Sequence, residues 1–212
     1  ADLRTGEILD ADIGMSDGFT RSARRWMVDD LARPRGHNGD MCEEAETSAQ
    51  ELHYALDLLE ARGIELDGPE AEALAKAYLK RTIMHEVGHT IGLRHNFRAS
   101  TLNDLKKVHD AEHTKIHGIA ASVMDYSPFN IAPKGEKQGE YVMSTLGVYD
   151  YWAVEFGYKQ FPPGQESEGL AQILAKSTQP ELQFDTDEDA GYGNVIGIDP
   201  LVNRFDLGSD PL

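Results

Sequence analysis

Two long segments of the chain carry apolar residues at helical spacing, with boundary signals at their ends. In residues 43–62 the apolar positions follow an i, i+3, i+4, i+7 pattern, which places them on one face of a helix. These positions are Leu52, Ala55, Leu56 and Leu59. Gly63 suits the end of this helix, and Pro69 suits the first turn of the next, which we expect to run to about Gly92.

The rest of the chain shows shorter patterns. We expect further helices at residues 20–32, 102–113, 145–156 and 166–177. Residues 4–13 form the best strand candidate, because Thr5, Ile8 and Ile13 lie among polar residues. Residues 178–212 are predicted as loop and turn. These patterns predict an α+β fold that is mainly helical.

Length and composition fit a single domain. The chain has 212 residues, of which 40% are hydrophobic and 27% charged, and it carries a formal charge of −17. This charge argues against nucleic acid or an anionic membrane as a partner. The apolar runs are too short to span a bilayer, and no signal peptide opens the chain, so we expect no membrane insertion. Cys42 is the only cysteine and cannot form an intramolecular disulfide.

The most specific pattern is HEVGHTIGLRH, an HExxHxxGxxH motif that begins at His85. Positions four apart share a helix face, so His85 and His89 can hold one metal ion. Glu86 lies beside them and could take a proton from a metal-bound water. Gly92 tolerates positive φ, which can turn the chain and bring His95 back as a third ligand. Three imidazoles with one open position are typical of a catalytic zinc site.

A second motif lies about thirty residues further on. The segment SVMDYSP has its methionine at Met124, where metzincins have a Met-turn after the third histidine. With both motifs the chain resembles the metzincins, a clan of zinc-dependent endopeptidases. The wider segments HEVGHTIGLRHNF, SVMDYSPFN and YDYWAVEFGY resemble a bacterial metzincin-like family found in large secreted or envelope proteins. The diagnostic motifs cover residues 85–128, and a weaker likeness extends to the C-terminus.

The resemblance implies roles for the motif residues. His85, His89 and His95 match the three zinc ligands, and Glu86 matches the general base. Met124 matches the methionine that forms a hydrophobic floor under the metal without being a ligand.

The resemblance also implies roles around the Met-turn. Tyr126 matches the tyrosine that astacins and serralysins place near zinc, where it ligates the resting metal or hydrogen-bonds the tetrahedral intermediate. An ordinary packing role is the alternative, because matrixins lack this tyrosine. Pro128 and Phe129 match the wall of the pocket for the residue after the cleaved bond.

These roles imply hydrolysis of peptide bonds in a protein or peptide substrate, by a zinc-activated water with Glu86 as base. The alternative function is a zinc-binding module that does not cleave and serves in binding or assembly. The family context implies a secreted, periplasmic or envelope-associated protein.

Two other clusters of metal-binding residue types leave alternatives open. His109, His113 and His117 recur at four-residue spacing, and they either form a second metal site or are solvent-exposed. The acidic residues 185–189 either bind calcium or form a solvated loop, and they lack the spacing of a known calcium loop. If His95 is not the third zinc ligand, Asp125 or His109 is the next candidate.

The chain departs from the metzincin pattern before the zinc helix. Metzincins have a mixed sheet of several strands there, whereas only residues 4–13 read as a strand. Either the fold has a reduced sheet, or this catalytic domain over 1–212 is a fragment of a longer protein, which we favour. Residues 1–92 would then end in the zinc-binding helix, and 93–212 would supply the third ligand and Met-turn. Residues 4–13 could hold substrate by strand addition or be purely structural.

Overall fold

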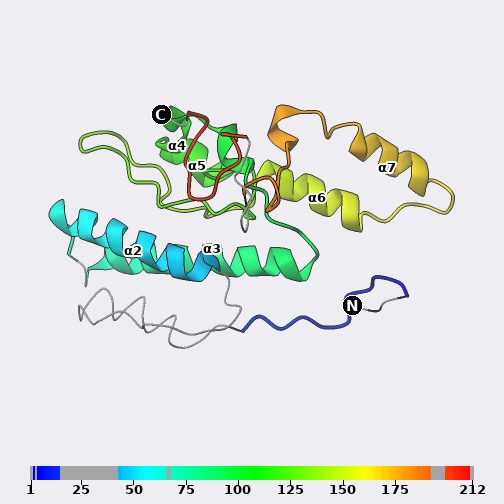
Figure 1. The fold of residues 1–212 in the computed structure, drawn as a ribbon, viewed down its shortest axis with the longest axis horizontal. Coiled ribbons are helices and arrows are strands. Elements are labelled where there is room, and N and C mark those ends of the chain that lie inside the picture. The colour runs from blue at the N-terminus through cyan, green and yellow to red at the C-terminus, as the bar shows by residue number, and fades with distance from the viewer. Residues whose placement is uncertain (1, 3, 15–42, 66–67, 192–198, 211–212) are drawn as a thin grey trace. The chain divides into compact units, whose positions relative to one another are not determined.

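The computed structural model describes residues 2, 4–14, 43–65, 68–191 and 199–210. The chain divides into two units, residues 1–83 and 84–212. The helices of the described part are shown in Figure 1. In chain order they are α2 (Glu43–Ala61), α3 (Pro69–Thr90), η1 (Ala99–Leu102), α4 (Leu105–Val108), α5 (Ala111–His117), α6 (Val148–Tyr158), α7 (Glu166–Leu174) and η2 (Pro180–Leu182).

The first unit contains α2 and most of α3, which confirms both long helices predicted from the apolar spacing. The four predicted apolar positions of α2 are all buried: Leu52, Ala55, Leu56 and Leu59. Gly63 has φ +89°, and Ile64 N–H donates to Leu59 O over 3.0 Å, so the chain leaves α2 at this glycine. Pro69 begins α3, as expected.

The strand predicted over residues 4–13 is wrong. Asp2 accepts hydrogen bonds from the backbone N–H of Arg4 and of Gly6, which has φ +74°, so this segment opens with a turn. Residues 6–14 have no regular structure and are exposed, and no strand among the described residues pairs with their backbone groups. No described residue lies in a strand, so the α+β class and the reduced sheet are not confirmed. The helix predicted at 20–32, and Cys42, lie outside the described residues.

The helix predicted over 102–113 is also wrong as a single element. Asp104 caps α4 by accepting from Lys107 N–H over 2.8 Å. Asp110 caps α5 by accepting from the N–H groups of Glu112 and His113 over 3.0 and 3.2 Å. An N-cap residue has a non-helical backbone, so the second aspartate starts a new helix and interrupts the first.

The predicted C-terminal helices are present with shifted ends. α6 begins three residues later than expected, because Gly147 precedes its first turn and Asp150 accepts from the Gly147 N–H over 2.7 Å. α6 contacts α7 through a hydrogen bond of 2.9 Å from Trp152 Nε1 to Ile173 O. Apart from η2, the described residues after 178 form loops and turns, as predicted.

The core of the second unit surrounds the segment 119–124. This segment runs antiparallel to residues 96–99: Asn96 N–H donates to Met124 O over 3.1 Å, and Ala121 N–H donates to Ala99 O over 2.9 Å. Tyr149 N–H in α6 donates to Ala121 O, so α6 is joined to the same segment. The buried cluster consists of Ala99, Val108, Ile119, Ala120, Ala121, Val123, Met124, Met143 and Tyr149.

The C-terminal segment 199–210 packs against the Met-turn. Phe205 N–H donates to Tyr126 O over 2.9 Å, and Val202 packs with Phe97 and Tyr126. Phe205 has φ +61°, a strained conformation for a bulky residue, so the surrounding contacts must hold it there.

A search of the described helices for membrane spans finds none that is both long enough and apolar enough.

Asp206 should make the stability of the second unit depend on pH. Burial raises the pKa of Asp206 to about 6, and its Oδ1 is buried with no hydrogen-bond partner among the described residues. The folded state therefore holds this proton more tightly than the unfolded state. The stabilisation is fully present below the unfolded pKa and is lost as pH rises towards 6.

Asp206→Asn stays neutral and should remove this loss. Chemical denaturation at pH 4.5 and pH 7 should show the variant gaining stability over the native chain at the higher pH. Asp210→Asn, at an exposed carboxylate, is the matched control. If the stability of Asp206→Asn differs from that of the native chain by the same amount at pH 4.5 and pH 7, the prediction is wrong.

Candidate metal centre

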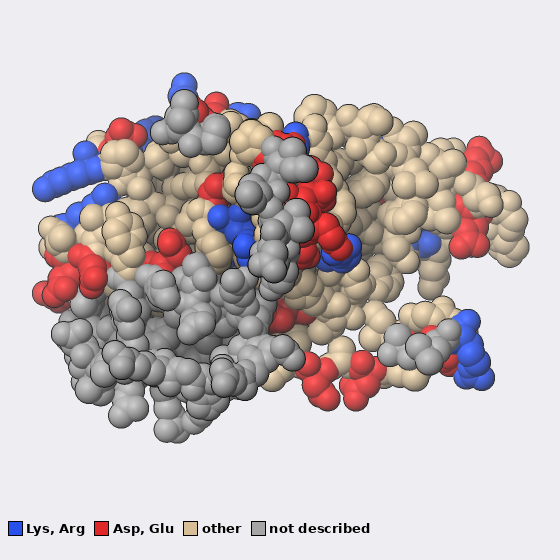
Figure 2. Space-filling view, in the orientation of Figure 1, with Lys and Arg blue, Asp and Glu red and all other residues tan. Residues whose placement is uncertain are grey.

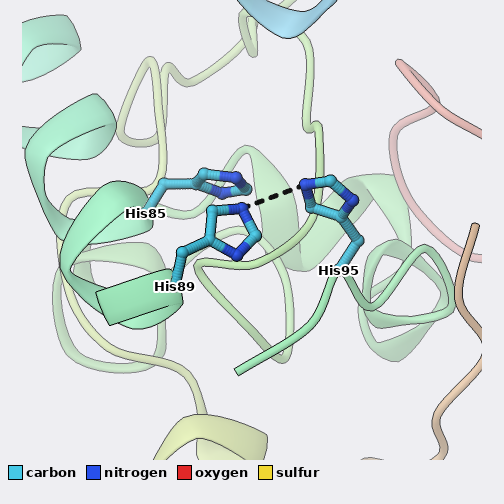
Figure 3. Close-up of side chains that lie close together, drawn as sticks. All are labelled: His85, His89 and His95. Atoms are coloured by element: carbon cyan, nitrogen blue, oxygen red, sulfur yellow. Dashed lines mark hydrogen bonds between the residues drawn. The ribbon is translucent and has the colours of Figure 1, made fainter. Parts of the chain in front are cut away.

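Three histidines converge in the second unit. His85 and His89 lie one turn apart near the end of α3, and His95 follows in the loop beyond it. One ring nitrogen from each lies within 4.8 Å of the others. Figure 3 shows the three rings pointing towards one another, with His95 approaching from the side opposite the helix. His85 is fully buried, and the other two are half-buried.

Gly92 turns the chain as the sequence predicted. It has φ +90°, and its N–H donates to His89 O over 3.0 Å, while Leu93 N–H donates to Gly88 O over 3.0 Å. This pair of bonds is the Schellman arrangement that ends a helix at a glycine. The turn lets His95 face the two histidines that the chain has just passed.

Each histidine uses Nδ1 for a hydrogen bond. His85 Nδ1 donates to Val123 O over 2.8 Å, and His89 Nδ1 donates to Leu93 O over 3.0 Å. His95 Nδ1 donates to Asp187 Oδ1 over 2.8 Å. Carbonyl and carboxylate oxygens can only accept, so the hydrogen must be on Nδ1 in each ring. In the neutral form of each ring, Nε2 then carries the lone pair.

This arrangement fits a zinc ion. His89 Nε2 and His95 Nε2 lie 3.1 Å apart, and two neutral nitrogens with lone pairs cannot donate to one another. A cation between them relieves this conflict. Two nitrogens bound tetrahedrally to zinc at 2.0–2.1 Å would lie about 3.3 Å apart, close to the spacing observed here. Neutral imidazoles with the second nitrogen hydrogen-bonded are typical zinc ligands.

The acceptor for His85 is itself held by a buried carboxylate. Asp150, which is 2% exposed, accepts from Val123 N–H over 2.9 Å and from the Ser122 hydroxyl over 2.6 Å. It also accepts from Gly147 N–H. Burial raises the pKa of Asp150, and these three hydrogen bonds oppose the rise. The Val123 carbonyl is thus fixed at the start of the Met-turn.

Met124 packs directly against the zinc-motif helix. It is fully buried, and a Cβ at position 88 would overlap its Sδ. Gly88 therefore allows Met124 to lie against α3 within the zinc motif. Sequence reasoning did not identify Gly88, because it occupies a variable position of the HExxHxxGxxH motif.

Tyr126 lies beside the third histidine. Its hydroxyl is 2.9 Å from His95 Nε2, the nitrogen that faces the other two rings. The ring is 3% exposed and contacts His95, Phe97 and Phe205, with centroid distances of 4.7, 5.1 and 5.6 Å. The hydroxyl is therefore held at the centre of the site by packing on several sides.

The remaining predicted site residues lie nearby in the chain. Glu86 follows His85 on α3 and is half-buried. Pro128 is half-buried, and Phe129 is buried at 9% exposure. The roles predicted for these residues, as base and pocket wall, stay predictions.

Asp187 is a site residue that the sequence did not identify. It is 92 positions away from His95 and lies in the acidic run that read as a solvated loop or calcium site. Burial tends to raise the pKa of Asp187, but hydrogen bonds from His95 and Thr186 outweigh it and lower the pKa, so the carboxylate is ionised. No spacing rule connects the two positions, and only the fold brings them together.

The second histidine series does not form a metal site. Among the described residues, the one group able to hold a metal is His85, His89 and His95. His113 Nε2 is 3.0 Å from Asn103 Oδ1, and its ring lies 4.8 Å from that of His117.

The alternative third ligands also have other roles. Asp125 accepts from Ser100 N–H over 2.7 Å, and His109 lies 3.7 Å from a Glu136 carboxylate oxygen.

Comparison with known proteins gives one match. A family model described as Met-zincin matches residues 67–212, which include the three histidines and the Met-turn. No curated protein and no solved structure matches the chain.

His95→Ala should weaken zinc binding by more than about 100-fold, since loss of even an outer hydrogen bond to a ligand costs 10- to 100-fold. Competition against a chromogenic chelator would measure the affinity. His117→Ala, at an exposed histidine, should bind zinc like the native chain. Full zinc affinity in His95→Ala would place the third ligand elsewhere.

Proposed function

Because the chain belongs to the Met-zincin family, we propose that it is a zinc-dependent endopeptidase. The observation that carries the proposal is the convergence of three Nε2 lone pairs, two of them on the helix that also carries Glu86. His85, His89 and His95 would hold the zinc. When bound, zinc supplies a Lewis acid that lowers the pKa of a bound water and polarises the scissile carbonyl.

Glu86 is the proposed proton carrier. The carboxylate follows the first histidine on α3 and is half-buried, so it lies next to the ligands without belonging to the converging group. It would take a proton from the attacking water as the oxygen bonds to the carbonyl carbon. It would then deliver that proton to the amine nitrogen as the C–N bond breaks.

Tyr126 is the proposed donor to the oxyanion. Its hydroxyl is directed towards the histidine cluster, and the ring is held by Phe97 and Phe205. A donor fixed in advance stabilises developing negative charge without reorganisation during the reaction.

The substrate would be a protein or peptide. Pro128 and Phe129 follow the Met-turn directly, and this position supports a role in the wall of the pocket for the residue after the cleaved bond. We further propose that the protein acts in a secreted, periplasmic or envelope setting, on the strength of the sequence resemblance.

Glu86→Gln should bind zinc like the native chain. Its rate of cleavage of an unfolded protein substrate should fall by about 10²–10⁴-fold, because glutamine cannot carry the proton. Zinc content and turnover should be measured on the same sample. Cleavage of the same substrate by the native chain should be abolished by a chelator and restored by zinc.

Near-native turnover in zinc-loaded Glu86→Gln would contradict the role of Glu86. A native chain that binds zinc but cleaves nothing, with its folding verified, would instead favour the non-cleaving binding module.

Tyr126→Phe should lower kcat by about 10²–10³-fold, with a much smaller change in KM, because the hydroxyl acts mainly on the transition state. The phenyl ring retains the packing with Phe97 and Phe205, so the melting temperature should change little. An unchanged kcat would assign Tyr126 to packing.

A further inference from the structure

We propose that residues 183–188 form a strap that holds the third histidine in its ligand position, with Asp187 as the positioning residue. The inference rests on the proposed zinc site. The inference gives a role to the acidic segment whose sequence is compatible with either a solvated loop or a calcium site.

The strap contacts the start of the loop after α3 through charged groups. Arg94 forms two hydrogen bonds to the Glu188 carboxylate over 2.8 and 2.9 Å, and also lies 3.6 Å from Asp187. His95 Nδ1 donates to Asp187 Oδ1 over 2.8 Å. Successive residues of the loop thus meet successive residues of the strap in reverse order.

The contacts continue along the backbone. Asn96 Nδ2 donates to Gln183 O over 3.0 Å, and Asp185 N–H donates to Asn96 Oδ1 over 3.3 Å. Phe97 N–H donates to Asp185 O over 2.9 Å. Because Asn96 and Phe97 are both fully buried, these bonds fix the strap at the protein interior and not merely at its surface.

Arg98 completes the pairing. Its Nε donates to Gln183 Oε1 over 3.0 Å, and its Nη1 contacts Asp185 over 3.2 Å and Asp199 over 2.5 Å. All five residues from 94 to 98 therefore bond to the strap. This is a continuous antiparallel contact, although its bonds are mostly made by side chains.

The acidic groups of the strap have separate internal partners. Asp185 pairs with Arg98, Asp187 with His95, and Glu188 with Arg94. Carboxylates distributed in this way do not converge on one centre, as calcium ligands must. On the face in Figure 2, acidic side chains gather near the middle of the view with basic side chains next to them.

The third histidine needs such support more than the other two. The backbone of α3 holds His85 and His89 at fixed spacing, whereas His95 lies in a loop with no helical hydrogen bonds. The 2.8 Å hydrogen bond to the Asp187 carboxylate fixes the ring orientation and the Nδ1–H tautomer, and it increases the basicity of Nε2. Asp187 therefore supports metal binding without touching the metal.

The test is zinc dissociation from Asp187→Asn, which keeps the shape and an acceptor oxygen but removes the charge. Zinc should leave the variant about 10–100-fold faster than the native chain when captured by excess chelator. The d–d spectrum of the cobalt-substituted variant should also change, because the His95 ligand is less firmly placed. Asp187→Ala, which removes the acceptor, should show a larger effect.

Glu188→Gln is the matched control. It removes one charge from the adjacent position, but this carboxylate is exposed and contacts Arg94 and not His95. Exposed pairs contribute little, so zinc dissociation should change by at most about fivefold. Melting temperatures measured without metal should be similar in both variants, because neither change removes core packing.

Native-like dissociation and spectrum in Asp187→Asn, with zinc bound by the native chain, would overturn this inference alone. Equal losses in Asp187→Asn and Glu188→Gln would also overturn it, since the effect would then arise from negative charge in general. A native chain that binds no zinc would overturn the proposed function as well.

Discussion

Three imidazole lone pairs face one another in the second unit, and the surrounding structure is arranged to keep them there. Each ring is fixed by a hydrogen bond from Nδ1 to an oxygen acceptor, so that in the neutral ring Nε2 carries the lone pair and is directed inwards. Two of these nitrogens are only 3.1 Å apart, a spacing that is unfavourable without a cation. The free energy of binding a metal here would therefore include relief of this repulsion, and the protein fold supplies the acceptors that hold the rings in place.

The three acceptors come from separate parts of the chain. Leu93 supplies a carbonyl from the turn that ends α3, Val123 supplies one from the Met-turn, and Asp187 supplies a carboxylate from the strap. The described part of this unit has no strands, so buried polar groups connect its loops. Asp150 is the main example: its desolvation is costly, but three donors offset that cost and fix the position of Val123.

The sequence predicted the parts of the site that depend on local periodicity. The spacing of His85 and His89, and the positive φ available to Gly92, follow from helix geometry and glycine sterics. Asp187 could not be predicted, because its contact with His95 spans 92 positions and no sequence rule pairs them. The two wrong elements have similar causes. Residues 4–13 have strand-like composition but no partner strand within the described part of the chain, and the cap at Asp110 outweighs the apolar pattern over 102–113.

The Tyr126 hydroxyl and a metal ion would compete for the same lone pair, that of His95 Nε2. His95 Nε2 can accept a hydrogen bond from the Tyr126 hydroxyl or bind a metal ion, but one lone pair cannot do both. A metal ion bound to His95 would therefore take this lone pair from the hydroxyl, while Phe97 and Phe205 keep the ring beside the site. In the proposed reaction the developing oxyanion would be a further acceptor for this hydroxyl, and the aromatic packing that holds Tyr126 beside His95 would place the donor in advance.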